Sequence, residues 1–138
     1  MPSPVVDTTF HVRYAETDAM GVVHHASYIV WFEEGRSSFM RACGIPYAEV
    51  ERRGYYFTVA MVKARYHAVA RYDDLMIVRT RLAELQSRGL TFTYEIRRAA
   101  DDLLCVTGET QHICIDQSGK VRRIPEDLVA VLSVKRET

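Results

Sequence analysis

The stretch RYAETDAMGVVHHASYIVWFEEGR, residues 13–36, decides the fold, because a polar turn in it leads directly into an amphipathic helix. Apolar and small residues then recur at spacings of three and four, at Tyr28, Trp31, Phe32, Gly35, Phe39, Ala42 and Cys43. A helical face this wide is expected to be buried. Gly35 costs about 1 kcal/mol of helix propensity relative to alanine. We therefore expect the backbone at Gly35 to be pressed against another element, such as a sheet wrapped around the helix.

Both ends of this helix carry capping signals. Ser27 is the expected N-cap, because its side-chain oxygen can accept a hydrogen bond from a first-turn N–H. Gly44 is expected just beyond the C-terminus, where the chain commonly adopts the left-handed conformation. A short second helix is predicted between Pro46, which suits a first helical turn, and Gly54, which would end it.

The rest of the chain alternates as strands do. Before the helix, residues 8–14 place Phe10, Val12 and Tyr14 on one side. After it, four strands are predicted at residues 56–66, 75–85, 90–98 and 103–116, and a last helical turn at 125–132. Short polar turns between consecutive strands favour antiparallel pairing. The prediction is a single α+β domain over residues 1–138, with a five-stranded antiparallel sheet wrapped around a long central helix.

Composition excludes several classes of function. Lys plus Arg and Asp plus Glu each number 18 in 138 residues, so no overall positive field attracts nucleic acid. The first ten residues, MPSPVVDTTF, lack the basic and apolar regions of a signal peptide, and no run of apolar residues is long enough to span a membrane. Three cysteines without C-x-x-C spacing argue against a disulfide framework or a zinc knuckle. We expect a cytoplasmic protein without integral membrane association.

Three stretches resemble the 4-hydroxybenzoyl-CoA thioesterase family of hotdog-fold proteins, most closely its Tol-Pal-associated short-chain acyl-CoA thioesterases. They are VRYAETDAMGVVHHASY at 12–28, YHAVARYDDLMIV at 66–78 and TGETQHICID at 107–116. The first is the most specific, because the acid, the turn glycine and the aromatic-bearing helix start are spaced as in the family. The resemblance implies a hotdog fold, hydrolysis of acyl-CoA to free acid and coenzyme A, and no cofactor. It also implies a homodimer or homotetramer with active sites at the dimer interface.

The resemblance assigns catalytic roles to the loop before the helix. Asp18 matches the family's catalytic carboxylate, which acts either as nucleophile or as general base for water. The backbone N–H of His25 matches the group that polarises the thioester carbonyl, and N–H groups at a helix N-terminus stabilise such developing negative charge. Gly21 permits a tight turn and close approach of the substrate. Without this motif, Asp18 would be interpreted as a turn cap.

Other acids and histidines support alternative interpretations. Glu16 could pair with Asp18, but a solvated turn acid is the preferred interpretation. Glu33 and Glu34 are weaker catalytic candidates, by analogy with a hotdog branch whose glutamate lies on the central helix; a polar helix face or a subunit contact is preferred. A hotdog dehydratase or isomerase and a non-catalytic thioester-binding module remain as alternative functions. The scattered histidines do not predict a metal site.

Substrate binding is predicted at the helix start and on the second strand. Tyr28 and His24 are expected to line the acyl pocket, with core packing as the alternative for Tyr28. The phosphates of coenzyme A need local cations. The expected cations are Lys63 and Arg65, with solvated edge charges as the alternative. By strict alternation, the same strand face carries apolar pocket residues at its other end, namely Phe57, Val59 and Met61. Further candidate cations are Arg88, Arg97, Arg98, Arg122 and Arg123.

Overall fold

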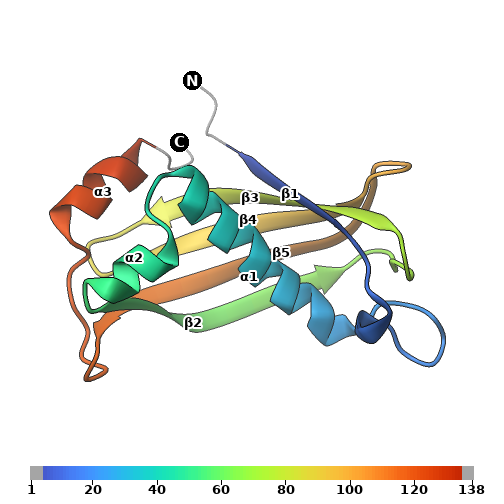
Figure 1. Cartoon of the computed structure of the whole chain (residues 1–138), viewed down its shortest axis with the longest axis horizontal. Helices are drawn as coiled ribbons and strands as arrows, with labels where there is room; N and C mark the ends of the chain where they lie inside the picture. The colour runs from blue at the N-terminus through green and yellow to red at the C-terminus, as the bar shows by residue number, and fades with distance from the viewer. Residues whose placement is uncertain (1–4, 135–138) are drawn as a thin grey trace.

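The computed structural model describes residues 5–134 as one antiparallel sheet with a long helix lying across one face (Figure 1). The strands are β1 Val6–His11, β2 Tyr55–Tyr66, β3 Leu75–Leu85, β4 Gly89–Arg98 and β5 Leu103–Asp116. The helices are α1 His25–Ala42, α2 Tyr47–Arg52 and α3 Glu126–Ser133, with a short 3₁₀ turn η1 at Tyr14–Glu16. The sheet order is β1-β3-β4-β5-β2 and every neighbouring pair is antiparallel. The predicted α+β architecture is confirmed.

Helix α1 buries its apolar stripe against the sheet. Trp31, Phe32 and Phe39 are almost completely buried. A Cβ atom placed on Gly35 would lie 2.5 Å from Thr80 Oγ1 and 2.8 Å from a methyl carbon of Val78, both on β3. The predicted close approach at Gly35 is therefore confirmed, because no side chain fits between this turn of the helix and the strand beneath it.

The N-terminus of α1 differs from the prediction. The N-cap is His24, whose ring Nδ1 accepts a hydrogen bond from the Ala26 N–H at 3.2 Å. Ser27 lies inside the first turn, and its hydroxyl donates to the backbone oxygen of Glu16 at 3.3 Å. The Ser27 prediction was wrong because the preceding turn holds the chain: the backbone N–H of His24 also donates to the Glu16 oxygen, at 2.8 Å. At the other end, Gly44 has a φ of +82°, as predicted.

The first strand ends earlier than its alternation predicts. It stops at His11, and the chain then turns into η1, where Tyr14 is 78% exposed. Val12 still packs in the core, but Tyr14 does not share its face. The reason is local, since the Glu16 carboxylate accepts a hydrogen bond from the Arg13 backbone N–H at 2.8 Å and bends the chain out of the sheet.

Strand β2 carries a β-bulge, with one extra residue between Val59 and Met61. Phe57 and Val59 lie opposite buried residues of β5 and face the side covered by α1. Beyond the bulge the alternation is shifted by one residue, so Met61, Lys63 and Arg65 face the outer side of the sheet. The prediction that all five residues share one face was wrong, because a bulge reverses the side-chain parity of every residue that follows it.

Candidate active site

The loop that carries Asp18 is a tight hairpin. The backbone N–H of Asp18 donates to the Val22 oxygen at 2.9 Å, and the Gly21 N–H donates to the Asp18 oxygen at 3.0 Å. Gly21 has a φ of +77°, the left-handed conformation that glycine adopts without strain. The Val23 N–H donates to the Ala70 oxygen at 2.9 Å and ties the hairpin to the segment after β2. Asp18 is therefore held at a defined position before the helix.

The two carboxylate oxygens of Asp18 have different surroundings. Oδ1 accepts hydrogen bonds from the backbone N–H groups of Met20 at 2.8 Å and Val22 at 3.4 Å. No residue in the described part of the chain hydrogen-bonds to Oδ2, and the residue is exposed in the single chain. Asp18 thus caps its own turn with one oxygen and leaves the other accessible to a ligand or a water molecule.

The first turn of α1 leaves one backbone donor available. The N–H groups of His24, Ala26 and Ser27 donate to the Glu16 oxygen, the His24 ring and the His24 oxygen respectively. The N–H of His25 has no acceptor within residues 5–134. Unpaired donors at a helix N-terminus are suited to bind negative or partially negative oxygen atoms.

A pocket of about 340 Å³ opens beside this helix end. Its lining residues are Val23, His25, Tyr28, Tyr66, His67, Ala68 and Val69. Tyr28 is 2% exposed and its hydroxyl accepts the Ala70 N–H at 3.2 Å, so it is both a core residue and a wall of the pocket. Burial raises the pKa of Tyr28, which keeps the hydroxyl protonated. The Tyr66 hydroxyl donates to the His25 oxygen at 3.0 Å.

His24 lies beside this pocket rather than in its wall. Its ring stacks on the His25 ring, with 4.3 Å between the ring centroids, and its Nδ1 caps the helix. Of the two histidines, only His25 lines the pocket. The geometry gives His24 a structural role in the first turn of α1.

Glu16 was predicted to be a solvated turn acid that takes no part in the site. Its side chain is only 12% exposed, so the interpretation as a solvated turn acid was wrong. Oε2 accepts hydrogen bonds from Trp31 Nε1 at 2.5 Å and from Arg13 Nη2 at 2.8 Å. Burial would raise the pKa of Glu16, but these hydrogen bonds outweigh it and the pKa lies below its usual value. The available signal was Trp31 in the buried stripe, because a buried indole N–H needs an acceptor.

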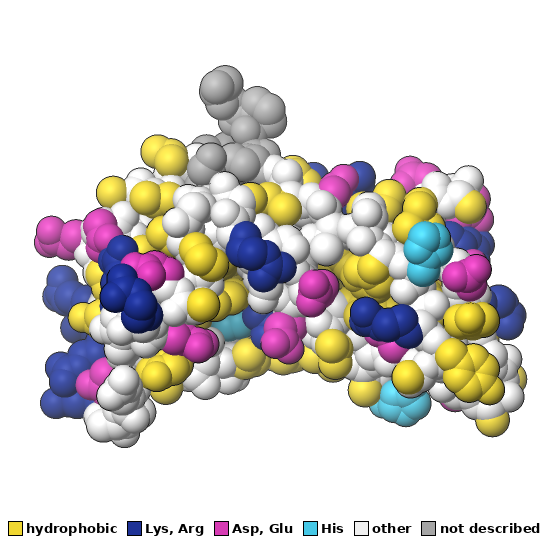
Figure 2. Space-filling model, viewed as in Figure 1, with side chains coloured by type: hydrophobic (Ala, Val, Ile, Leu, Met, Phe, Trp, Pro, Cys, Tyr) yellow, Lys and Arg dark blue, Asp and Glu magenta, His cyan; other side chains and the backbone are white. Residues whose placement is uncertain are grey.

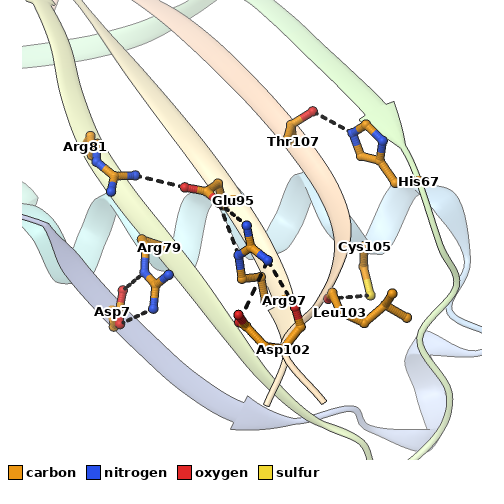
Figure 3. Close-up of polar contacts among 10 residues, drawn as sticks. All are labelled: Asp7, His67, Arg79, Arg81, Glu95, Arg97, Asp102, Leu103, Cys105 and Thr107. Atoms are coloured by element: carbon orange, nitrogen blue, oxygen red, sulfur yellow. Dashed lines mark hydrogen bonds and ion pairs between the residues drawn. The ribbon is translucent and has the colours of Figure 1, made fainter. Parts of the chain in front are cut away.

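On the outer face of the sheet most arginines are neutralised by carboxylates (Figure 3). Arg79 pairs with Asp7 at 2.9 Å, and Arg97 pairs with Glu95 at 2.8 Å. Arg81 also reaches Glu95, at 3.1 Å. Two further candidate cations are paired in the same way, Arg98 with Asp101 and Arg122 with Asp116. These arginines are poor candidates for binding phosphate.

Lys63 and Arg65 differ from those arginines. Neither forms an ion pair with another residue in the described ranges. Both line an outer-face pocket of about 470 Å³ together with His67, whose ring nitrogen is 3.0 Å from Thr107 Oγ1 (Figure 3). His67 also lines the pocket at the helix end. The two pockets therefore share one lining residue, His67, just beyond the end of β2.

No group of three or more His, Cys, Asp and Glu side chains in residues 5–134 is arranged to hold a metal ion. None of the described helices has the length and hydropathy that a membrane crossing requires.

The chain matches known proteins over most of its length. The family model of the thioesterase-like superfamily matches residues 12–132. The acyl-CoA thioester hydrolase YbgC of Escherichia coli O157:H7 is 32% identical and is aligned over 86% of this chain and 89% of its own. The acyl-CoA thioesterase YbgC of Haemophilus influenzae is 31% identical, with 82% of each chain covered.

Solved structures agree with these sequence relatives. Protein TT1821 of Thermus thermophilus superposes with a TM-score of 0.91 at 44% identity, covering 98% of this chain and all of its own. The DHNA-CoA thioesterase of Staphylococcus aureus superposes with a TM-score of 0.89 at 30% identity, covering 94% of this chain and 89% of that one. The chain therefore belongs to the thioesterase-like superfamily, and it is a thioester hydrolase with the hotdog fold that its motifs predict.

Proposed function

We propose that this protein hydrolyses acyl-CoA thioesters to a free acid and coenzyme A. The observation that carries the proposal is a pair of unused groups on one short segment: Oδ2 of Asp18 and the N–H of His25. One is a carboxylate oxygen able to attack or to accept a proton, and the other is a donor for a carbonyl oxygen. The names of the YbgC relatives support coenzyme A as the carrier.

The reaction follows from these two groups. The thioester oxygen accepts a hydrogen bond from the His25 N–H, and the helix end stabilises the negative charge that develops on it. In one route, Asp18 attacks the carbonyl carbon, the C–S bond breaks with release of the thiolate, and water hydrolyses the resulting anhydride. In the other route, Asp18 takes a proton from a water molecule that attacks the same carbon. Gly21 allows the substrate to approach the hairpin closely.

The two pockets divide the substrate between them. The pocket with Tyr28 takes the acyl group next to the reacting carbonyl, and Phe57 and Val59 extend an apolar surface on the same side of the sheet. Lys63 and Arg65 bind phosphates of coenzyme A on the outer face. Because His67 lines both pockets, the pantetheine arm passes around the end of β2. Met61 lies on the outer face and contacts the coenzyme A portion.

We propose that two copies associate through β2, as a homodimer or as half of a homotetramer. This strand is a sheet edge, and its helix-facing side exposes Val59, Val62 and Tyr66 by 40 to 47%. Figure 2 shows hydrophobic side chains along the lower edge of the molecule, where β2 runs in Figure 1. Pairing two such edges covers the unpaired backbone groups and the apolar side chains. The acid-bearing hairpin of one copy then lies near the pocket wall of the other.

Thiol release from short, medium, long and aromatic acyl-CoAs tests the function, with the native protein compared with Asp18→Asn. Asparagine keeps the Oδ1 acceptor for Met20 and Val22 but removes the nucleophile or base. We expect a loss of at least about 100-fold in rate. Asp116→Asn is the matched control, because Asp116 Oδ1 caps its turn in the same way, through the N–H groups of Ser118 and Lys120.

The outcomes separate the alternatives. If Asp18→Asn keeps the native rate, Asp18 is only a turn cap, and Glu33 and Glu34 become the residues to substitute. If neither protein hydrolyses any thioester while both bind one, the chain is a binding module. An acyl group attached to Asp18 in quenched single-turnover samples identifies the nucleophilic route.

A further inference from the structure

The carboxylate of Glu16 connects the end of β1 to the central helix. Oε1 accepts the backbone N–H of Arg13 at 2.8 Å, and Oε2 accepts the Arg13 guanidinium at 2.8 Å and the Trp31 indole N–H at 2.5 Å. The Glu16 side chain is 12% exposed, whereas that of Arg13 is 65% exposed. The ion pair with Arg13 is thus largely in solvent and stabilises little by itself. The hydrogen bond with Trp31, by contrast, is formed with a buried side chain.

The backbone of the same residue holds the start of the helix. The Glu16 carbonyl oxygen accepts the His24 N–H at 2.8 Å and the Ser27 hydroxyl at 3.3 Å. These partners flank His25, whose N–H is the donor proposed for the thioester oxygen. Asp18 follows Glu16 by two residues. One residue therefore fixes both sides of the site, the hairpin that carries the acid and the turn that carries the donor.

Trp31, which donates to the Glu16 carboxylate, is held rigidly in the core. Trp31 is 1% exposed, and its ring packs edge-on against Phe10 and Tyr28, with 5.0 Å between centroids in each pair. Tyr28 also lines the pocket at the helix end. A displacement of Glu16 relative to Trp31 would therefore move the hairpin with respect to the pocket wall, while the wall itself stayed in place.

We propose that Glu16 is a positioning residue for thioester hydrolysis, which fixes the Asp18 hairpin against the His25 N–H without touching the substrate. The inference rests on the proposed function, because it assigns Glu16 a role through Asp18 and His25. Reacting groups tolerate little displacement: a shift of about 1 Å costs on the order of 100-fold in rate. Glu16 is therefore expected to affect turnover more than substrate affinity.

The test is Glu16→Gln, which keeps the shape of the side chain but removes its charge and one acceptor. We expect kcat for acyl-CoA hydrolysis to fall about 10- to 100-fold, with KM changed by less than about threefold. Asp7→Asn is the matched control, because it breaks another partly exposed carboxylate–arginine pair, with Arg79 at 2.9 Å on the outer face of the sheet. This control is expected to keep the native kcat.

Trp31→Phe provides a second variant, because it removes the indole donor and keeps an aromatic ring. If Glu16 acts through Trp31, the double variant loses no more kcat than Glu16→Gln alone. Backbone amide hydrogen exchange in residues 18–23 is expected to be faster in both single variants and unchanged in Asp7→Asn. If Glu16→Gln does not fold, Trp31→Phe is judged by the same two measurements.

Each result has a definite meaning. An active native protein with a Glu16→Gln kcat within about twofold of native overturns the positioning role. A loss of thermal stability with native kcat also overturns it, because Glu16 would then be merely structural. A native protein inactive on every thioester contradicts the proposed function instead. In that case, unchanged amide exchange in residues 18–23 of Glu16→Gln overturns the positioning role, and faster exchange supports it.

Discussion

Gly35 of α1 and Thr80 of β3 approach so closely that a Cβ atom on the glycine would lie 2.5 Å from the threonine Oγ1. The helix therefore crosses the sheet at backbone contact distance. This contact lies within the same helix that begins at His25. The depth of α1 over the sheet, and with it the position of the helix N-terminus, is set by the absence of one methyl group.

Gly35→Ala is expected to destabilise the protein in spite of alanine's better helix propensity. The propensity gain is about 1 kcal/mol, whereas overpacking a core contact costs about 1–3 kcal/mol. Thr80 and Val78 are both completely buried and cannot move aside freely. Urea unfolding measures the difference. Thr80→Ala should restore part of the loss in the double variant, and a Gly35→Ala protein more stable than native would contradict the prediction.

Stability is expected to fall as the pH drops from 6.5 toward 4, with His112 as one cause. Burial, with a contribution from the nearby Arg36 guanidinium, lowers the pKa of His112 from its ordinary 6.5 to about 4. Between these values the unfolded chain binds a proton that the folded protein does not. The free energy of unfolding then decreases by up to about 3 kcal/mol across this window.

The contribution of His112 is isolated by comparing unfolding free energies of native protein and His112→Gln at several pH values. The difference between native and variant should shrink as the pH falls, because glutamine does not titrate. His11→Gln, on an exposed position of β1, is the control and should keep the native pH dependence. Parallel curves for native protein and His112→Gln would contradict the prediction.

Removal of Lys63 and Arg65 together is expected to weaken binding of the nucleotide end of the substrate. Loss of charge-assisted hydrogen bonds to phosphate should raise KM for acyl-CoA about tenfold or more, with kcat little changed. An acyl thioester of N-acetylcysteamine, which lacks the nucleotide, should show no difference. The double variant Arg79→Gln, Arg81→Gln removes two outer-face cations that already have carboxylate partners, and equal KM changes in both double variants would contradict the assignment.

Val62→Glu is expected to dissociate the proposed dimer. Val62 is 40% exposed on the helix-facing side of edge strand β2, so two glutamates would be brought together in the interface. Sedimentation should show a monomer for this variant. Val121→Glu is the control, since Val121 is 48% exposed but lies outside the strands. Native protein that already sediments as a monomer would contradict the proposed interface.

The strands were the most predictable part of this protein. The bounds of β3 and β5 agree with the prediction, and β2 and β4 each begin one residue earlier, because alternation and polar turns are local signals. The end of β1 and the N-cap of α1 were wrong for one shared reason. Both depend on contacts of Glu16, whose carboxylate accepts the Arg13 N–H and whose backbone oxygen accepts the His24 N–H, and neither contact shows in the alternation of apolar residues.

Of the candidate site, only the motif before the helix could be recognised from the sequence. The positions of Asp18 and His25 follow from the segment before the helix, and their catalytic roles stay predictions. The face of Lys63 and Arg65 was wrong, because a bulge is a property of the pairing between β2 and β5 and leaves no mark on the strand itself. The sequence also does not show which cations lack a carboxylate partner, because ion pairs such as that of Arg97 with Asp102 form only in the folded protein.

The extra residue in β2 has a consequence for how this enzyme could be altered. Ala60, between Val59 and Met61, is the point at which the strand exchanges its two faces. Deleting Ala60 would remove the bulge and leave Val59 and Met61 opposite His112 and Gln111, so Lys63 and Arg65 would keep the outer face. The strand can therefore lose one residue at this position without moving its two cations to the side that faces α1.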